Sequence, residues 1–147
     1  MPSLSHIIDK EHGYAVRIPE QTPDGQTVSV ETNTSENVHV LHAYSPDRSE
    51  LYFEITTYPA LLNHQALIAA QRHFLSERSL DEQIGEPSQQ VLAGHHCTAF
   101  DFRGELGGEL RERRFLFIDG PFFTYRIVYD STSRLNELVL QSLKLAD

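Results

Sequence analysis

A change of hydrophobic period divides this chain and limits the folds that are open to it. The runs 13–19, 27–31, 38–44 and 51–58 are rich in β-branched and aromatic residues, and turn-forming residues separate them. In the last run, one strand face would hold Leu51, Phe53 and Ile55 and the other Tyr52, Glu54 and Thr56. Residues 63–78 instead place apolar side chains at helical spacing. Strand patterns then return.

The segment 63–78 predicts the strongest helix of the chain. Asn63 is a suitable N-cap because its side chain can accept a hydrogen bond from the first helical turn. The apolar stripe of this helix contains Leu67, Ile68, Ala70, Phe74 and Leu75. We expect the helix to pack across a sheet through this stripe, with the ring of Phe74 fully buried.

The second half of the chain predicts an antiparallel meander. Residues 95–103 alternate between two sets that face opposite sides of a strand: Thr98, Phe100 and Phe102, and Cys97, Ala99 and Asp101. The runs 109–118 and 122–130 predict two long strands. Residues 133–145 have the apolar spacing of a second helix.

The turn at 119–121 decides how the two long strands pair. A two-residue turn would place Arg113 opposite Arg126, and like charges in direct opposition repel each other. A three-residue loop avoids this contact. We therefore predict the three-residue loop, with the pairs Phe117–Phe123 and Phe115–Tyr125.

Helices segregated from runs of consecutive hairpins favour the α+β class. We expect an antiparallel β-sheet of five or more strands, with the helices packed on its faces. A length of 147 residues fits one domain, so we assign residues 1–147 to a single domain. A chain of this size can bury enough surface to fold without disulfides or structural metals.

The charge and the cysteine content argue against several classes of protein. A net charge of −9 is unfavourable for nucleic-acid and anionic-membrane partners, which select basic surfaces. No apolar run approaches the ~20 residues of a membrane span. The first nine residues lack a signal-peptide pattern, and the single cysteine cannot form an internal disulfide. We therefore expect a cytoplasmic protein that binds neither nucleic acid nor membrane.

The sequence contains no catalytic motif, phosphate loop or cofactor motif, so we expect neither enzyme activity nor a cofactor. The densest cluster of metal-ligand residue types is His95, His96 and Cys97. On a strand, His96 would point away from the other two, so we expect no metal unless ligands assemble across strands. His39 and His42 would also point to opposite faces. We interpret Cys97 as a small core residue rather than a nucleophile.

Two arginines form the most informative polar feature. Arg111 and Arg113 continue the strand face of Phe115 and Phe117, so this face changes from polar to apolar along the strand. Guanidinium groups are rarely buried without partners because of their desolvation cost. We therefore expect both arginines at the edge of a cleft, with their heads free to meet an anionic or planar group.

The predicted pairing gives this cleft aromatic walls, because it places two tyrosines beside the arginines. The candidate binding residues are therefore Arg111, Arg113, Tyr125 and Tyr129. The alternative is a solvated strand end at which Glu105 and Glu109 pair with the arginines. The sequence leaves both interpretations open.

Several segments share their order and character with one known superfamily. Residues 13–19 (Gly-Tyr-Ala-Val-Arg-Ile-Pro) form an opening aromatic strand that ends in proline. The strand 51–58 leads into the helix 63–78, and residues 92–102 form a strand of small, polar and aromatic residues. A long hairpin and a helix near Ser142 close the chain. This layout resembles the PsbP/DcrB-like superfamily, whose fold a yeast Ran-binding adaptor also uses.

The resemblance implies an α/β/α sandwich and an accessory role, since members of this superfamily assist photosystem assembly, nuclear-transport GTPase cycling or the loading of secreted effectors. It carries over no functional residue. We therefore expect a non-catalytic binding, adaptor or accessory protein with a protein or peptide partner. The alternatives are a small-molecule or lipid carrier with a cavity between sheet and helices, and a histidine-based metalloprotein or enzyme. An exposed edge strand at 27–31 would also allow a homodimer.

Overall fold

Two antiparallel sheets and two helices make up the part of the chain that the structure describes. The computed structural model describes residues 4–48 and 50–146. In chain order its elements are β1 (Leu4–Asp9), β2 (Tyr14–Pro19), β3 (Ser29–Ser35), β4 (Val38–Tyr44), β5 (Tyr52–Tyr58), α1 (His64–Arg78), β6 (Ser79–Ile84), β7 (Ser88–Leu92), β8 (His95–Leu106), β9 (Glu109–Asp119), β10 (Thr124–Asp130), α2 (Arg134–Gln141) and β11 (Lys144–Leu145).

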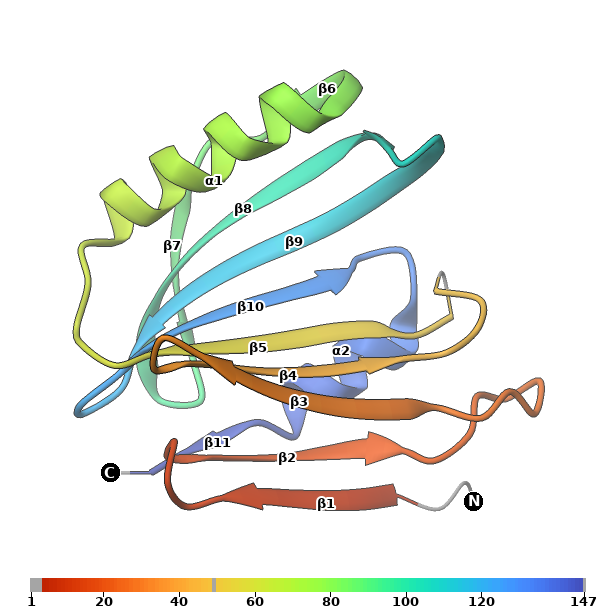
Figure 1. Cartoon of the computed structure of the whole chain (residues 1–147), viewed down its shortest axis with the longest axis vertical. Coiled ribbons are helices and arrows are strands. Elements are labelled where there is room, and N and C mark those ends of the chain that lie inside the picture. The colour runs from red at the N-terminus through yellow and green to blue at the C-terminus, as the bar shows by residue number, and fades with distance from the viewer. Residues whose placement is uncertain (1–3, 49, 147) are drawn as a thin grey trace.

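The larger sheet has eight strands, in the order β3-β4-β5-β10-β9-β8-β6, with β7 also paired to β8 (Figure 1). The long strands β8, β9 and β10 form an antiparallel meander at its centre. The smaller sheet has the order β1-β2-β11. The predicted antiparallel sheet of five or more strands is confirmed.

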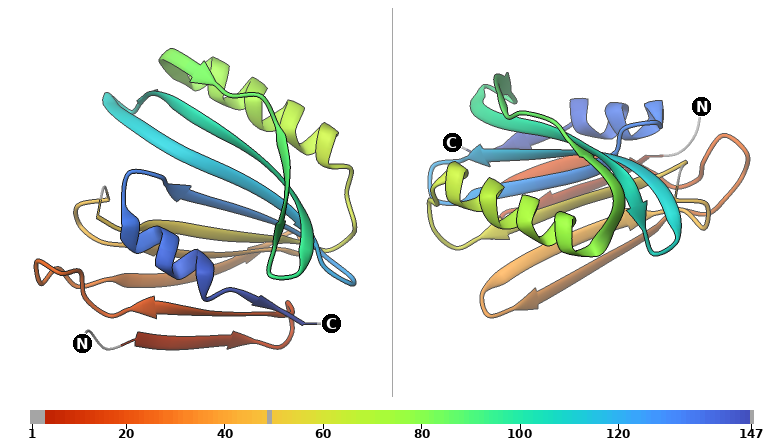
Figure 2. Two further views of the ribbon diagram at one scale, coloured as in Figure 1. Left: turned by 180° about the vertical axis from the view of Figure 1, so that it is seen from behind. Right: turned by 90° about the horizontal axis from the view of Figure 1, so that it is seen from above.

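The helices cover opposite faces of the larger sheet (Figures 1 and 2). On one face, α1 packs over the α1-side core, which consists of Tyr52, Ile68, Leu75, Phe100, Phe102, Phe115, Phe117 and Val128. On the other face, α2 and the smaller sheet pack over the α2-side core, which includes Tyr14, Ile18, Cys97, Phe53, Tyr125, Ile127, Tyr129 and Val139. The α+β prediction is confirmed. Neither helix in the described residues is long and apolar enough to cross a membrane.

Helix α1 begins where the sequence predicts, but the face that it buries differs from the predicted one. The side chain of the N-cap Asn63 accepts a hydrogen bond from the first helical turn at 3.1 Å. Ile68 and Leu75, seven positions apart, are the buried residues of the helix. The predicted burial of Phe74 is wrong, since this residue is 48% exposed and its ring lies 5.0 Å from the guanidinium of Arg78. The helix contacts the sheet along the line that Ile68 and Leu75 define, and the side chain of Phe74 lies beside this line.

Strand β3 also differs from its prediction. The sequence predicts a strand at 27–31, whereas β3 covers Ser29–Ser35 and pairs along the whole of β4. All seven of its residues are exposed, and the polar residues 31–35 have no apolar alternation to reveal that the strand continues. The turn residues Glu36 and Asn37 have φ angles of 52° and 66°, the left-handed conformation that a two-residue hairpin turn requires.

The pairing of β9 with β10 corrects the predicted hairpin. Four residues, Gly120–Phe123, form the loop, and the N–H of Gly120 donates to the carbonyl of Phe123 at 2.8 Å. Phe117 is therefore opposite Arg126 instead of Phe123, a shift of three positions. An odd shift turns the side chains of one strand to the other face of the sheet. The predicted pairs Phe117–Phe123 and Phe115–Tyr125 are wrong.

Helix α2 is shorter than the predicted 133–145. It ends at Gln141, and the hydroxyl of Ser142 then accepts a hydrogen bond from the backbone N–H of Arg17 on β2 at 2.9 Å. This contact precedes β11, which pairs with β2. The sequence also predicts neither β1 nor β6. The smaller sheet joins the first two strands of the chain to β11 near its other end, so local sequence patterns do not reveal it.

Candidate functional site

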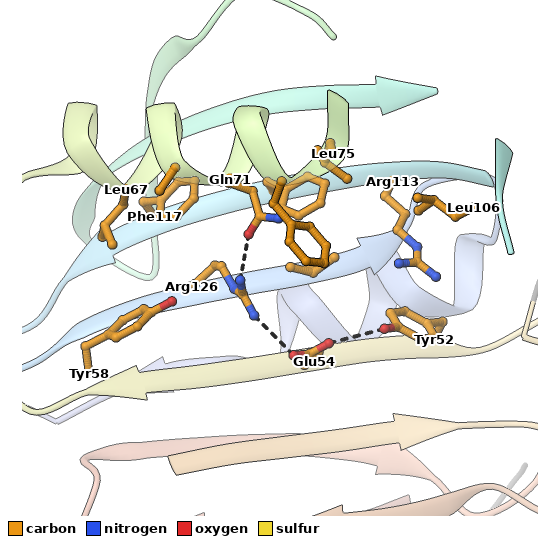
Figure 3. A pocket seen from close by; sticks show the side chains of 14 residues that line it. Tyr52, Glu54, Tyr58, Leu67, Gln71, Leu75, Leu106, Arg113, Phe117 and Arg126 are labelled. Atoms are coloured by element: carbon orange, nitrogen blue, oxygen red, sulfur yellow. Dashed lines mark hydrogen bonds and ion pairs between the residues drawn. The ribbon is translucent and has the colours of Figure 1, made fainter. Parts of the chain in front are cut away.

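A pocket of about 410 Å³ lies between α1 and the larger sheet (Figure 3). Apolar side chains of the α1 side form most of its wall, among them Leu67, Leu75, Phe115, Phe117 and Val128. Polar side chains from four elements also line it: Tyr52 and Glu54 from β5, Gln71 from α1, Arg113 from β9 and Arg126 from β10. The pocket thus combines an aromatic wall with two guanidinium groups.

Arg126 is held by partners on both sides of the pocket. Its Nη1 donates to Oε1 of Gln71 at 2.6 Å, and its Nη2 lies 3.3 Å from Oε1 of Glu54 (Figure 3). The second oxygen of Glu54 accepts a hydrogen bond from the hydroxyl of Tyr52 at 3.2 Å. These bonds connect α1 to the sheet, and Glu54 neutralises the charge of Arg126.

Arg113 has no such carboxylate partner among the described residues. Its guanidinium carbon lies 4.3 Å from the centre of the Tyr52 ring, which is a cation–π contact. Its Nε is buried and makes no hydrogen bond to any described residue. Nε of Arg126 is also buried without a partner, so the difference between the two arginines is that no carboxylate of the described residues neutralises the charge of Arg113. This charge can attract an anion. Burial raises the pKa of Tyr52, and the charge of Arg113 partly opposes this effect.

The predicted cleft residues are divided between the two faces of the sheet. Arg113 lines the pocket, but Arg111 forms an ion pair with Glu109, as in the alternative interpretation of the sequence. Tyr125 and Tyr129 lie in the α2-side core on the opposite face, almost fully buried. Their predicted position beside the arginines is wrong, because the true pairing turns β10 over relative to β9.

The sequence does not identify Tyr52, Glu54, Gln71 or Arg126 as site residues. The alternation of 51–58 does place Tyr52 and Glu54 on one face, and the structure confirms it. Arg126 is missed because the wrong pairing assigns it to the other face. Gln71 gives no signal in the sequence, since an uncharged polar residue in a helix is usually solvated.

The histidine and cysteine candidates do not form a common site. Cys97 is fully buried, and burial raises the pKa of its thiol to about 11, which disfavours a nucleophilic thiolate. His96 is exposed, and its ring stacks 6.2 Å from that of His64. Among the described residues, no group that could hold one metal ion includes His95, His96 or Cys97. His42 lies on the α1 side, with its ring 4.8 Å from that of Tyr52.

Known proteins offer similar structures but no similar sequence. No protein-family model matches this chain, and no curated protein matches it. Cyanobacterial PsbP (CyanoP) from Synechocystis sp. PCC 6803 aligns over 99% of this chain and 94% of its own length, with a TM-score of 0.64 and 12% identity. This chain has the PsbP-like fold. A protein from Bacteroides thetaiotaomicron matches all of this chain with 50% of its own length, with a TM-score of 0.62 and 12% identity.

The PsbP-like fold confirms the resemblance that the order of elements suggests. The pocket lies beneath α1 (Figure 3), and α1 covers the face of the sheet opposite α2 (Figure 2). At 12% identity the likeness establishes the fold and no function. A role for the pocket must therefore be argued from its own side chains.

Proposed function

We propose that this protein is a non-catalytic binding protein, and that the pocket beneath α1 holds an acidic group of a protein or peptide partner. The observation that carries the proposal is Arg113, a pocket guanidinium that pairs with no carboxylate among the described residues, whereas Arg126 pairs with Glu54. A planar guanidinium can bind a carboxylate through two parallel hydrogen bonds. Such a ligand would supply the negative charge that Arg113 lacks among the described residues.

The charges of the pocket favour a negatively charged ligand. Glu54 already pairs with Arg126, so the second arginine leaves a net positive charge in the pocket. The protein as a whole carries a net charge of −9, which makes this local positive charge unusual. The low dielectric of a partly enclosed pocket strengthens the attraction for an anion. A carboxylate next to an apolar side chain would complement both the arginine and the aromatic wall.

The rim of the pocket favours a macromolecular partner. Phe74 lines the pocket yet is 48% exposed, so apolar surface continues from the pocket onto the outside of α1. An exposed aromatic residue beside a polar anchor is typical of protein interfaces. The hydroxyl of Tyr52 and the carboxylate of Glu54 are hydrogen-bonded to each other, and Glu54 also pairs with Arg126, so we assign both groups to holding this arginine rather than to catalysis. Binding without catalysis is therefore the proposed role.

A small-molecule carrier is the second candidate function. The volume of about 410 Å³ lies within the range of ligand pockets, roughly 300–1,000 Å³. A carboxylate on a short apolar chain would place its head at Arg113 and its tail against Phe115 and Phe117. The two candidates thus use the same guanidinium and differ in the size of the ligand.

The test compares two probes on the wild type and on Arg113→Ala. One probe is a synthetic peptide of alternating aspartate and leucine, and the other is octanoate. Binding is followed by chemical-shift changes in the ¹⁵N-labelled protein and by titration calorimetry. Arg103→Ala is the matched control, since Arg103 lies on the neighbouring strand, is exposed and pairs with Glu112 at 3.3 Å.

We expect Arg113→Ala to weaken binding by about 10- to 100-fold, because a hydrogen bond to a charged group contributes roughly 1.5–3 kcal/mol. The stability of this variant should change little, and the control should bind as the wild type does. Tighter binding of the peptide supports the adaptor, and tighter binding of octanoate the carrier. The proposal is refuted if neither probe binds to the wild type at about 1 mM. It is also refuted if Arg113→Ala binds the probes as tightly as the control Arg103→Ala does.

A further inference from the structure

Three side chains with metal-ligand atoms meet where the β1–β2 hairpin packs against β4. They are Asp9, His12 and His39, and their ligand atoms all lie within 4.8 Å of one another. Oδ2 of Asp9 lies 2.8 Å from Nδ1 of His12 and 3.3 Å from Nε2 of His39. Two imidazole nitrogens thus approach the same carboxylate oxygen. One belongs to His12, in the turn between β1 and β2, and the other to His39 on β4 of the larger sheet.

We propose that Asp9, His12 and His39 form a binding site for a divalent transition-metal ion such as Zn²⁺. Zinc binds imidazole nitrogen and carboxylate oxygen at roughly 2.0–2.2 Å in tetrahedral geometry. Two ligand atoms at adjacent corners of that tetrahedron are then about 3.3 Å apart. The separation of 3.3 Å equals this spacing, and the 2.8 Å contact is a hydrogen bond that the ion would replace. All the ligand atoms lie within 4.8 Å of one another, so a small rearrangement of the side chains would bring them to three corners.

Neighbouring groups orient the ligands from behind. The backbone N–H of His12 donates to Oδ1 of Asp9 at 2.9 Å, which leaves Oδ2 directed at the imidazoles. The hydroxyl of Thr34 lies 3.0 Å from Nδ1 of His39 and so binds the ring nitrogen that faces away from Asp9. Such outer contacts are typical of metal-ligating histidines, since they fix the tautomer and leave the other ring nitrogen free for the metal.

An unsatisfied atom in the cluster also points to a missing ligand. Nε2 of His39 is buried and makes no hydrogen bond to a described residue, although it faces the Asp9 carboxylate. The side chains of Asp9, His12 and His39 are only 17%, 16% and 10% exposed, so water satisfies them poorly. A bound cation would satisfy all three groups at once, and a water molecule would complete its coordination.

The donor atoms select the class of ion. Two imidazoles and one carboxylate suit Zn²⁺, Co²⁺ or Ni²⁺, whereas Mg²⁺ and Ca²⁺ prefer sites made only of oxygen. The two imidazole rings are stacked 4.0 Å apart and nearly parallel. Binding therefore requires both rings to rotate until their lone pairs converge, and the ion displaces any proton on the ligating nitrogens. The bound ion would join the β1–β2 hairpin to the larger sheet.

The test titrates tag-free protein with ZnCl₂ by calorimetry and follows thermal unfolding. We expect one ion per chain and a rise in Tm of about 5–10 °C at a hundredfold excess over Kd, since a ligand that binds only the folded state stabilises it. Asp9→Asn and His12→Ala should each weaken binding at least tenfold. The control His73→Ala removes a histidine that is 73% exposed and pairs with Glu77, and it should bind as the wild type does.

Imidazole ¹⁵N spectra of the wild type locate the ion without any substitution, so the result does not depend on how the variants fold. The ligating nitrogens of His12 and His39 should shift on addition of zinc, while those of His73 and His96 stay unchanged. The proposal is overturned if zinc does not bind, if the shifts occur at other histidines, or if folded His12→Ala binds zinc with unchanged affinity.

Discussion

Two adjacent residues of α1 differ sharply in burial and so test how this helix packs. Leu75 is 2% exposed, and Phe74 is 48% exposed. Leu75→Ala removes three buried carbon groups, which contribute about 0.8 kcal/mol each, and leaves a cavity. Leu75 already borders the pocket, so the added cavity penalty is small. We expect a loss of about 3 kcal/mol in the free energy of unfolding.

Phe74→Ala removes the larger side chain but should cost less. A fully buried phenylalanine contributes up to about 3 kcal/mol, and about half of the ring is buried here. Alanine also has a better helix propensity, by about 0.5 kcal/mol. The expected loss is therefore about 1 kcal/mol.

Urea unfolding followed by far-ultraviolet circular dichroism separates these values, and this probe suits a chain without tryptophan. With a slope of about 2 kcal/mol per molar urea, Leu75→Ala should lower the midpoint by about 1.5 M and Phe74→Ala by about 0.5 M. Equal losses, or a larger loss for Phe74→Ala, would refute the packing of α1 on the sheet through Leu75.

Three further predictions concern buried polar groups. Burial raises the pKa of Cys97 to about 11, so a thiol reagent at about pH 8 should react at least 100-fold more slowly with the folded than with the unfolded protein. Burial lowers the pKa of His42 below 6.5; the unfolded chain then binds the proton more readily, so stability should fall as the pH drops below about 6.5. His42→Phe should reduce this loss in urea titrations between about pH 7.5 and about pH 5.5. The fully buried Asn136 accepts from the N–H of Tyr52 at 3.1 Å and donates to the carbonyl of Asp130 at 2.9 Å, so Asn136→Ala should cost about 2–4 kcal/mol in urea unfolding.

The arrangement of the pocket suggests why α1 carries so little buried surface of its own. Only Ile68 and Leu75 are buried on this helix, and the hydrogen bond from Arg126 to Gln71 adds a polar attachment to the sheet. The space that larger apolar side chains would fill is instead the pocket. A binding site and a sparsely packed helix are thus two aspects of the same interface.

Local patterns in the sequence determine much of this fold. The alternation in 51–58 separates Phe53 from Tyr52 and Glu54, and the structure places them on opposite faces. The apolar spacing of 63–78 and the cap at Asn63 define α1 within one residue. These features depend on neighbours within a few positions, so they can be recognised without knowing the rest of the structure.

Only the tertiary structure decides which distant residues meet. The register of β9 with β10 depends on a four-residue loop. Residues 115–118 of β9 and most of β10 are buried on both faces, so the apolar pattern permits more than one pairing. That register brings Arg126 to the face of Phe117 and removes Tyr125 from it. Likewise His12 and His39 are 27 positions apart in the sequence and stack at 4.0 Å because two sheets pack together. Contacts of this kind follow from the packing of whole elements, and neither the pocket nor the histidine pair has a signature within a single segment.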